Sequence, residues 1–192
     1  MTTEVEAIIF SEADQALEIS MATDNSSLEE QFLQIYLWPE LPLLLPVQNL
    51  VEILKLSLNQ VVPMFQMSPW VMGVYNWRGD MLWVADLGHF LGLAPWYEQA
   101  EPTTNHSVVV LNTSASATSL AGEAPTSLGC LVRSVQGMVT GSVQKIPLGA
   151  DLGEIPSSLM PFLKGRLVTK EGQSRFILDG VAVLEIMAQS HL

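Results

Sequence analysis

The chain has 192 residues, of which 48% are hydrophobic and only 15% are charged, and its formal net charge is −12. This composition can bury a substantial core and is typical of a cytoplasmic protein. The longest apolar run, residues 41–47, is interrupted by Pro42 and Pro46, and it is far shorter than the roughly 20 residues that a membrane span needs. The N-terminus carries Glu4 and Glu6 where a secretory signal would have basic residues. We therefore expect no direct insertion into a membrane.

The charge is distributed unevenly. Residues 1–54 contain ten acidic residues and no Lys or Arg, whereas residues 55–192 contain ten acidic and eight basic residues. The eight basic residues are scattered along the sequence: Lys55, Arg78, Arg133, Lys145, Lys164, Arg166, Lys170 and Arg175. Because binding to a phosphate backbone depends on clustered cations, the sequence predicts no nucleic-acid partner.

The N-terminal residues 1–28 are polar and acidic and end in a turn-like stretch, Thr23 to Ser27. We predict that they form a flexible tail ahead of one domain at residues 29–190. A second irregular region, residues 113–127, is rich in Ser, Thr, Ala and Gly and is expected to be a flexible surface loop.

Short strand-like runs with frequent turn residues follow the tail. They include residues 108–111, 165–170 and 174–178, the last two flanking Glu171 to Gln173 as a hairpin. This pattern is typical of a β-barrel or a β-sandwich. From Asp179 to Ser190, the residues Val181, Leu184 and Met187 recur at intervals of three, which predicts a C-terminal amphipathic helix.

The most specific local pattern lies between residues 72 and 93. Residues 72–77 and 81–85 are rich in Val, Met, Tyr and Trp, and the turn Arg78-Gly79-Asp80 separates them. Asp86 directly precedes the run 87–91, where its carboxylate can cap a short helix, and Gly92 can end that helix in a left-handed conformation. The sequence therefore predicts a β-hairpin followed by a capped helical turn.

The chain shows no pattern of an active site. His89, His106 and His191 are far apart, and the single Cys130 has no partner for a disulfide or a zinc site. We interpret Cys130 as a buried small hydrophobic residue. No GxxxxGK phosphate loop and no GxSxG nucleophile motif is present. We therefore predict a protein that is not an enzyme and that has no metal or other cofactor.

The motif around the hairpin resembles the signature of the CheW adaptor family of chemotaxis signalling. The matching order is Gly73-Val74-x-Asn76-x-Arg78-Gly79, then Val84-x-Asp86-Leu87, and finally Gly92-Leu93. The resemblance extends to other parts of the chain. In the first half, residues 31–37 match the opening strand, 50–54 a short helical segment and 106–112 a return strand. In the second half, residues 129–135 match a strand, and 162–165 with 176–179 match the closing hairpin. Trp77, Trp83 and Arg133 depart from the residues that are usual in the family.

The resemblance implies a mainly β fold of two five-stranded, SH3-like β-barrel subdomains side by side, with short helices and a C-terminal helix. It also implies a non-enzymatic adaptor that couples a chemoreceptor to a CheA-type histidine kinase. One barrel would dock onto the regulatory domain of the kinase, and the groove between the barrels would accept the signalling tip of the receptor. Such a protein would be cytoplasmic and recruited to receptor arrays at the membrane.

The protein-binding residues that the resemblance implies fall into three groups. They are Leu50 and Glu52 near the kinase-facing edge, Gly73, Asn76, Arg78 and Gly79 around the hairpin, and Gly129, Val135 and Met138 on the receptor side. Gly73, Gly79 and Gly129 have the alternative role of permitting backbone geometry. Arg78 can clamp a partner or brace its own hairpin through Asp86 or Asn76. Asp86 and Gly92 are assigned to the structure of the motif.

An unrelated β-barrel module that binds a peptide or single-stranded nucleic acid is the alternative function. Trp70, Trp77 and Trp83 are accompanied by Met and Val rather than by basic residues, which favours a core or a protein interface over base stacking. The Trp-rich motif and the acidic tail favour a divergent signalling system, such as type IV pilus motility or phototaxis.

Overall fold

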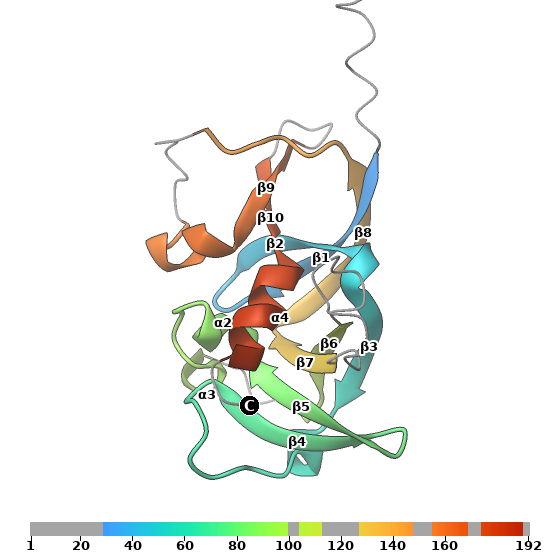
Figure 1. The fold of residues 1–192 in the computed structure, drawn as a ribbon, viewed down its shortest axis with the longest axis vertical. Helices are drawn as coiled ribbons and strands as arrows, with labels where there is room; N and C mark the ends of the chain where they lie inside the picture. Colours follow the sequence, from blue (N-terminus) through green and yellow to red (C-terminus); the bar gives the residue numbers. More distant parts are fainter. Residues whose placement is uncertain (1–28, 100–103, 113–126, 148–154, 169–173, 190–192) are drawn as a thin grey trace, which may run out of the picture.

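The computed structural model describes residues 29–99, 104–112, 127–147, 155–168 and 174–189 (Figure 1). The predicted N-terminal tail, nearly all of the predicted loop at 113–127 and the turn Glu171 to Gln173 lie outside these residues. Within them, most regular structure is β-strand, arranged as two five-stranded sheets. The predicted mainly β fold is confirmed.

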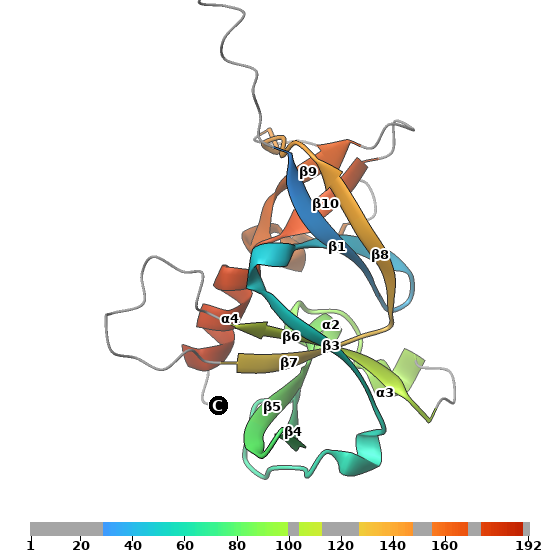
Figure 2. The same ribbon diagram turned by 90° about the vertical axis from the view of Figure 1, so that its right-hand side faces the viewer.

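The first sheet has the strand order β8-β1-β2-β10-β9. Its strands are β1 (Glu30–Leu37), β2 (Leu41–Pro46), β8 (Ser134–Gly141), β9 (Leu163–Val168) and β10 (Ser174–Leu178). The second sheet has the order β3-β6-β7-β5-β4. Its strands are β3 (Leu50–Leu56), β4 (Val71–Trp77), β5 (Asp80–Asp86), β6 (His106–Asn112) and β7 (Ser127–Val132). The two sheets are stacked along the long axis of the molecule, with the first above the second in both views (Figures 1 and 2).

The two sheets have the same topology in a circularly permuted order. Reading along each sheet from β8 and from β3, neighbouring strands pair antiparallel, antiparallel, parallel and antiparallel. The second sheet is formed by five consecutive strands, β3 to β7. In the first sheet, the N-terminal strands β1 and β2 take the places that β6 and β7 have in the second.

Each sheet curls so that one short bridge connects its two edges. In the second sheet, Val62, which follows β3, exchanges two backbone hydrogen bonds of 2.8 and 2.9 Å with Val74 of β4. In the first sheet, Gln144, which follows β8, does the same with Arg166 of β9. These equivalent bridges give each sheet an SH3-like form, although a continuous ladder does not close either barrel.

Helical segments are short except at the C-terminus. They are η1 (Val47–Asn49), η2 (Leu58–Gln60), α2 (Leu87–Phe90), α3 (Trp96–Gln99), η3 (Ser157–Phe162) and α4 (Gly180–Gln189). Before α4, the Asp179 carboxylate accepts hydrogen bonds from the N–H groups of Val181 and Ala182, both at 3.1 Å. The C-terminal helix is thus confirmed, and its fully buried face is formed by Val183, Leu184 and Met187.

The largest hydrophobic core lies between the two sheets and against α4. It combines Leu33, Ile35 and Leu43 of the first sheet with residues such as Val109 and Cys130 of the second sheet. β-Strands place alternate side chains on opposite faces, so every second side chain of these strands points away from the core between the sheets. These side chains form a smaller core inside each curled sheet. One of these contains Phe32 and Ile177, and the other contains Leu56, Val84 and Val108.

Two local predictions need correction. Residues 50–54, expected to be helical, form part of β3, which pairs with β6 from Leu50 opposite Leu111 to Leu56 opposite His106. The helical turn is instead η1, just before this strand. The run 129–135 is divided between β7 and β8, because the chain passes from the second sheet to the first at Arg133.

Candidate functional site

The hairpin of β4 and β5 is confirmed, with a tighter turn than predicted. Trp77 pairs with Asp80, so the loop contains only Arg78 and Gly79. These residues have φ values of 57° and 95°, which is the conformation of the two-residue turns that match the twist of a β-hairpin. The Asn76 side chain accepts a hydrogen bond of 3.1 Å from the N–H of Gly79. Asn76 therefore stabilises the turn from within the hairpin.

The hairpin turn is tied to the far edge of the same sheet. The Arg78 guanidinium lies 2.8 Å from Oε2 of Glu52 on β3. The indole N–H of Trp77 donates to the same oxygen at 3.0 Å, and the Arg78 guanidinium carbon lies 5.3 Å from the centre of a Trp77 ring. Arg78 is thus braced by Glu52 rather than by Asp86 or Asn76, the two partners considered from the sequence. Its side chain is still 69% exposed, so the guanidinium remains accessible to another molecule.

Other predicted binding residues on the second sheet are less accessible. Leu50 is partly buried and packs against the core between the sheets. Gly73 and Gly129 are both buried. A Cβ atom on Gly129 would lie 2.9 Å from Cγ1 of Val108. For Gly73 and Gly129, the geometry supports the backbone and packing role, whereas Gly79 is exposed at the turn.

The predicted receptor-side residues Val135 and Met138 lie on β8, at an edge of the first sheet. Val135 is half-buried against the core between the sheets. Met138 is 58% exposed. The structure therefore joins Glu52, Asn76, Arg78 and Gly79 into one cluster, and it places Met138 on the other sheet.

Sequence reasoning missed an apolar surface on the connection between η2 and β4. Val62 is 60% exposed, Met64 44% and Phe65 89%. On the neighbouring hairpin, Met81, which pairs with Asn76, is 68% exposed. The one available signal was an apolar run beside Pro63 in a connection where polar residues are usual. Exposed large apolar side chains of this kind occur at protein interfaces.

Asp86 connects the hairpin to both helices that follow it. Its side chain is buried, and it accepts hydrogen bonds from the N–H groups of His89 at 3.1 Å and Trp96 at 2.8 Å. The first bond confirms the predicted helix cap, and the second, to the start of α3, was not predicted. Burial raises the pKa of Asp86 above its ordinary value of 3.8, although the two N–H bonds and the nearby His89 act in the opposite direction. The predicted left-handed Gly92 is also confirmed, with φ of 85°.

The described residues offer little catalytic chemistry. Cys130 is fully buried, and desolvation raises the pKa of its thiol to about 12, so the thiol is not a nucleophile at neutral pH. No group of three His, Cys, Asp or Glu side chains that could hold a metal ion occurs in the part of the chain that the structure describes. Among the described helices, none has the length and apolar character that a membrane crossing requires.

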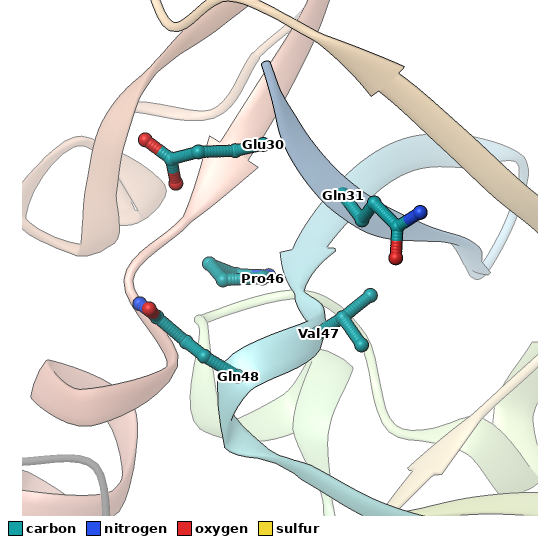
Figure 3. Close-up of a pocket in the computed structure, with 5 residues that line it drawn as sticks. All are labelled: Glu30, Gln31, Pro46, Val47 and Gln48. Atoms are coloured by element: carbon teal, nitrogen blue, oxygen red, sulfur yellow. The ribbon is translucent and has the colours of Figure 1, made fainter. Parts of the chain in front are cut away.

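One open cavity of about 300 Å³ lies where β1 and β2 meet η1. It is lined by Glu30, Gln31, Pro46, Val47 and Gln48 (Figure 3). In Figure 3, Glu30 and Gln31 project in opposite directions from β1. One carboxylate and two amides that do not converge provide no nucleophile with a neighbouring base. This cavity is therefore a poor candidate for an active site.

Comparisons with known proteins agree with this geometry. The family model described as "CheW-like domain" matches residues 31–187. A crystal structure of the scaffolding protein TtCheW from Thermoanaerobacter tengcongensis is similar in fold, with a TM-score of 0.63 and 14% sequence identity, covering 86% of this chain and 99% of that chain. The comparison with curated proteins finds no match. Because the family model covers both sheets, the chain belongs to the family of CheW-like domains.

Proposed function

We propose that the protein is a non-enzymatic adaptor that couples a chemoreceptor of the methyl-accepting type to a CheA-type histidine kinase. The observation that carries this proposal is the family match across both sheets, residues 31–187. It is supported by an exposed Arg78 on a hairpin that Glu52 braces and by the exposed apolar side chains next to that hairpin. Aromatic residues, methionine and arginine are enriched at protein interfaces.

The proposed kinase-binding surface consists of the turn Arg78–Gly79 with Asn76, Glu52 on β3, and the apolar residues Phe65 and Met81. Glu52 and Asn76 hold the turn in one conformation before any partner arrives. A preformed surface loses less conformational entropy on binding than a mobile loop does. The exposed Met138 on β8 is the proposed point of contact with the receptor tip. We also propose a cytoplasmic location, with recruitment to receptor arrays through these contacts.

The direct test is calorimetry with the regulatory domain of a CheA-type kinase from the same organism. We expect a specific complex with the kinase domain and no retention on single-stranded DNA at moderate salt. The result would contradict the proposal if every such kinase of the organism failed to bind. Binding to single-stranded DNA or to an unrelated peptide would instead support the alternative of an unrelated binding module.

Replacement of Arg78 tests the proposed surface itself. Arg78→Ala removes an exposed ion pair, which contributes at most about 1 kcal/mol to the free energy of unfolding. A central arginine in an interface typically contributes about 2 kcal/mol or more to binding. We therefore expect near-native thermal unfolding and roughly 30-fold weaker binding to the kinase domain. Unfolding and affinity should be measured on the same preparation.

Glu52→Gln is the matched control for Arg78→Ala. It removes the ion pair but keeps an oxygen that can accept from the indole N–H of Trp77. If Arg78 contacts the kinase, Glu52→Gln should weaken binding much less than Arg78→Ala does. Equal losses of affinity in both variants would contradict a contact made by Arg78 alone, because the ion pair as a unit or Glu52 itself would then carry the binding.

The output of the pathway is a separate proposal. Trp77 and Trp83 within the motif, together with the acidic tail at residues 1–28, favour a divergent system such as type IV pilus motility or phototaxis. Deletion of the gene should then impair surface motility or directed movement in light and leave flagellar swimming unchanged. Loss of swimming chemotaxis alone would contradict this assignment.

A further inference from the structure

A small cavity lies on the second sheet where β4 begins and where α2 and α3 follow β5. Its volume is about 200 Å³, and it is lined by Pro69, Val71, Met72, Asp86, His89, Trp96 and Tyr97. It does not include the hairpin turn or Glu52, so it is separate from the surface proposed above for the kinase. This small cavity therefore combines one carboxylate, one imidazole, one thioether and two large aromatic rings.

Among the described residues, the Asp86 carboxylate makes no ion pair with a Lys or Arg, although the positive form of His89, which also lines the cavity, attracts it. Its exposed fraction is 2%, and its described partners are the backbone N–H groups of His89 and Trp96. A carboxylate has about four acceptor positions, so the N–H groups of His89 and Trp96, together with the nearby N–H of Gly88, still leave capacity for a ligand. Burial of a carboxylate is unfavourable, and a bound cation would stabilise it further.

The aromatic residues of the cavity are held in a fixed arrangement. The rings of Trp96 and Tyr97 are nearly perpendicular, at 84°, with centroids 6.0 Å apart. The backbone N–H of Trp96 donates to Asp86, and its indole ring makes an edge contact with the His106 ring, with centroids 5.3 Å apart. These two contacts hold Trp96 in place. Aromatic walls beside a carboxylate attract ammonium groups through the negative faces of the rings, and Trp is the most effective of these walls.

The size of the cavity limits the ligand. Pockets for drug-sized molecules usually have volumes of about 300 to 1,000 Å³, so about 200 Å³ accommodates only a small group. Weakly hydrated ammonium ions lose little hydration energy against apolar walls such as Pro69, Val71 and Met72. We propose that this cavity binds a small quaternary ammonium group, in the corner formed by Asp86, Trp96 and Tyr97.

The test is isothermal calorimetry on the full chain with choline chloride, at constant ionic strength. The control ligand is 3,3-dimethyl-1-butanol, which has the shape of choline but no charge. We expect saturable binding of choline and at least roughly tenfold weaker binding of the neutral compound, because the charge carries the interaction. A peptide containing trimethyl-lysine forms a second arm: preference for it over choline would identify a modified side chain as the natural source of the ammonium group.

Two substitutions locate the site. Tyr97 is 64% exposed, so Tyr97→Ala should leave folding intact and weaken choline binding about two- to fivefold, whereas Tyr97→Phe should retain binding. Asp86→Asn should abolish binding in any preparation whose circular dichroism shows a folded protein. The proposal is overturned if choline does not bind, which would leave Asp86 as a helix cap alone. Equal affinity for choline and the neutral compound, or no effect of Tyr97→Ala, would overturn it as well.

Discussion

Gly73→Ala is expected to destabilise the protein severely, by about 3 kcal/mol or more in the free energy of unfolding. A Cβ atom at this position would lie 2.1 Å from the carbonyl oxygen of Val62 and 2.9 Å from Cα of Pro63. Both obstacles are backbone atoms, and they cannot move away without breaking the bridge between Val62 and Val74 that connects the sheet edges. The φ value of 139° adds strain for any residue with a side chain. Urea unfolding followed by circular dichroism measures the loss.

Two other glycines provide graded controls. Gly79 also has a positive φ, 95°, but a Cβ there would meet no atom within 4 Å. Gly79→Ala should therefore cost only backbone strain, about 1 to 2 kcal/mol. Gly165 has the equivalent place at the bridge of the first sheet, where a Cβ would lie 2.8 Å from the Gln144 carbonyl oxygen. Gly165→Ala should fall between the two, and a Gly73→Ala variant as stable as Gly79→Ala would refute the steric argument.

Asp86→Ala is the second substitution with a large expected effect. It leaves the N–H groups of His89 and Trp96 without their acceptor in a partly buried setting. An unsatisfied buried donor costs about 1 to 3 kcal/mol, so the free energy of unfolding should fall by about 2 to 4 kcal/mol. Asp179→Ala is the matched control, because Asp179 caps α4 at the equivalent place in the other sheet. Asp179→Ala should lower the free energy of unfolding by less, near the ordinary value of about 1 kcal/mol for a helix cap.

The stability contributed by Asp86 should depend on pH in a defined direction. Since burial raises its pKa in the folded protein above 3.8, the folded state binds this proton more tightly than the unfolded chain does. The contribution of Asp86 to the free energy of unfolding is complete below pH 3.8, and it declines as the pH rises through the folded-state pKa. The stability difference between the wild type and Asp86→Asn should therefore decrease over this interval and then remain constant. A difference that grows with pH would mean that the two N–H bonds outweigh desolvation.

Local sequence patterns predicted the elements whose geometry depends on a few neighbouring residues. The hairpin at Arg78 and Gly79, the cap at Asp86 and the left-handed Gly92 were all predictable, because turn and cap conformations are selected by the residues that form them. The C-terminal helix followed from apolar residues spaced three apart, which need only one apolar surface to pack against. The family resemblance added the arrangement in two sheets.

Tertiary structure decided which surfaces these elements present. The sequence could not show that Glu52, 26 positions before Arg78 in the chain, would be its partner, because the curl that brings the two edges of the sheet together results from long-range pairing. Nor could it distinguish the buried Gly129 from a contact residue, since only the packed neighbours Leu82 and Val108 exclude a side chain there. No local sequence pattern predicted that β1 and β2 would lie beside the C-terminal strands β8 to β10. By itself, the sequence determined the β-hairpin, the capping residues and the succession of short strands. Only the packed fold determined the partners of Arg78 and Asp86 and the exposure of Phe65 and Met81, because these depend on atoms distant in the chain.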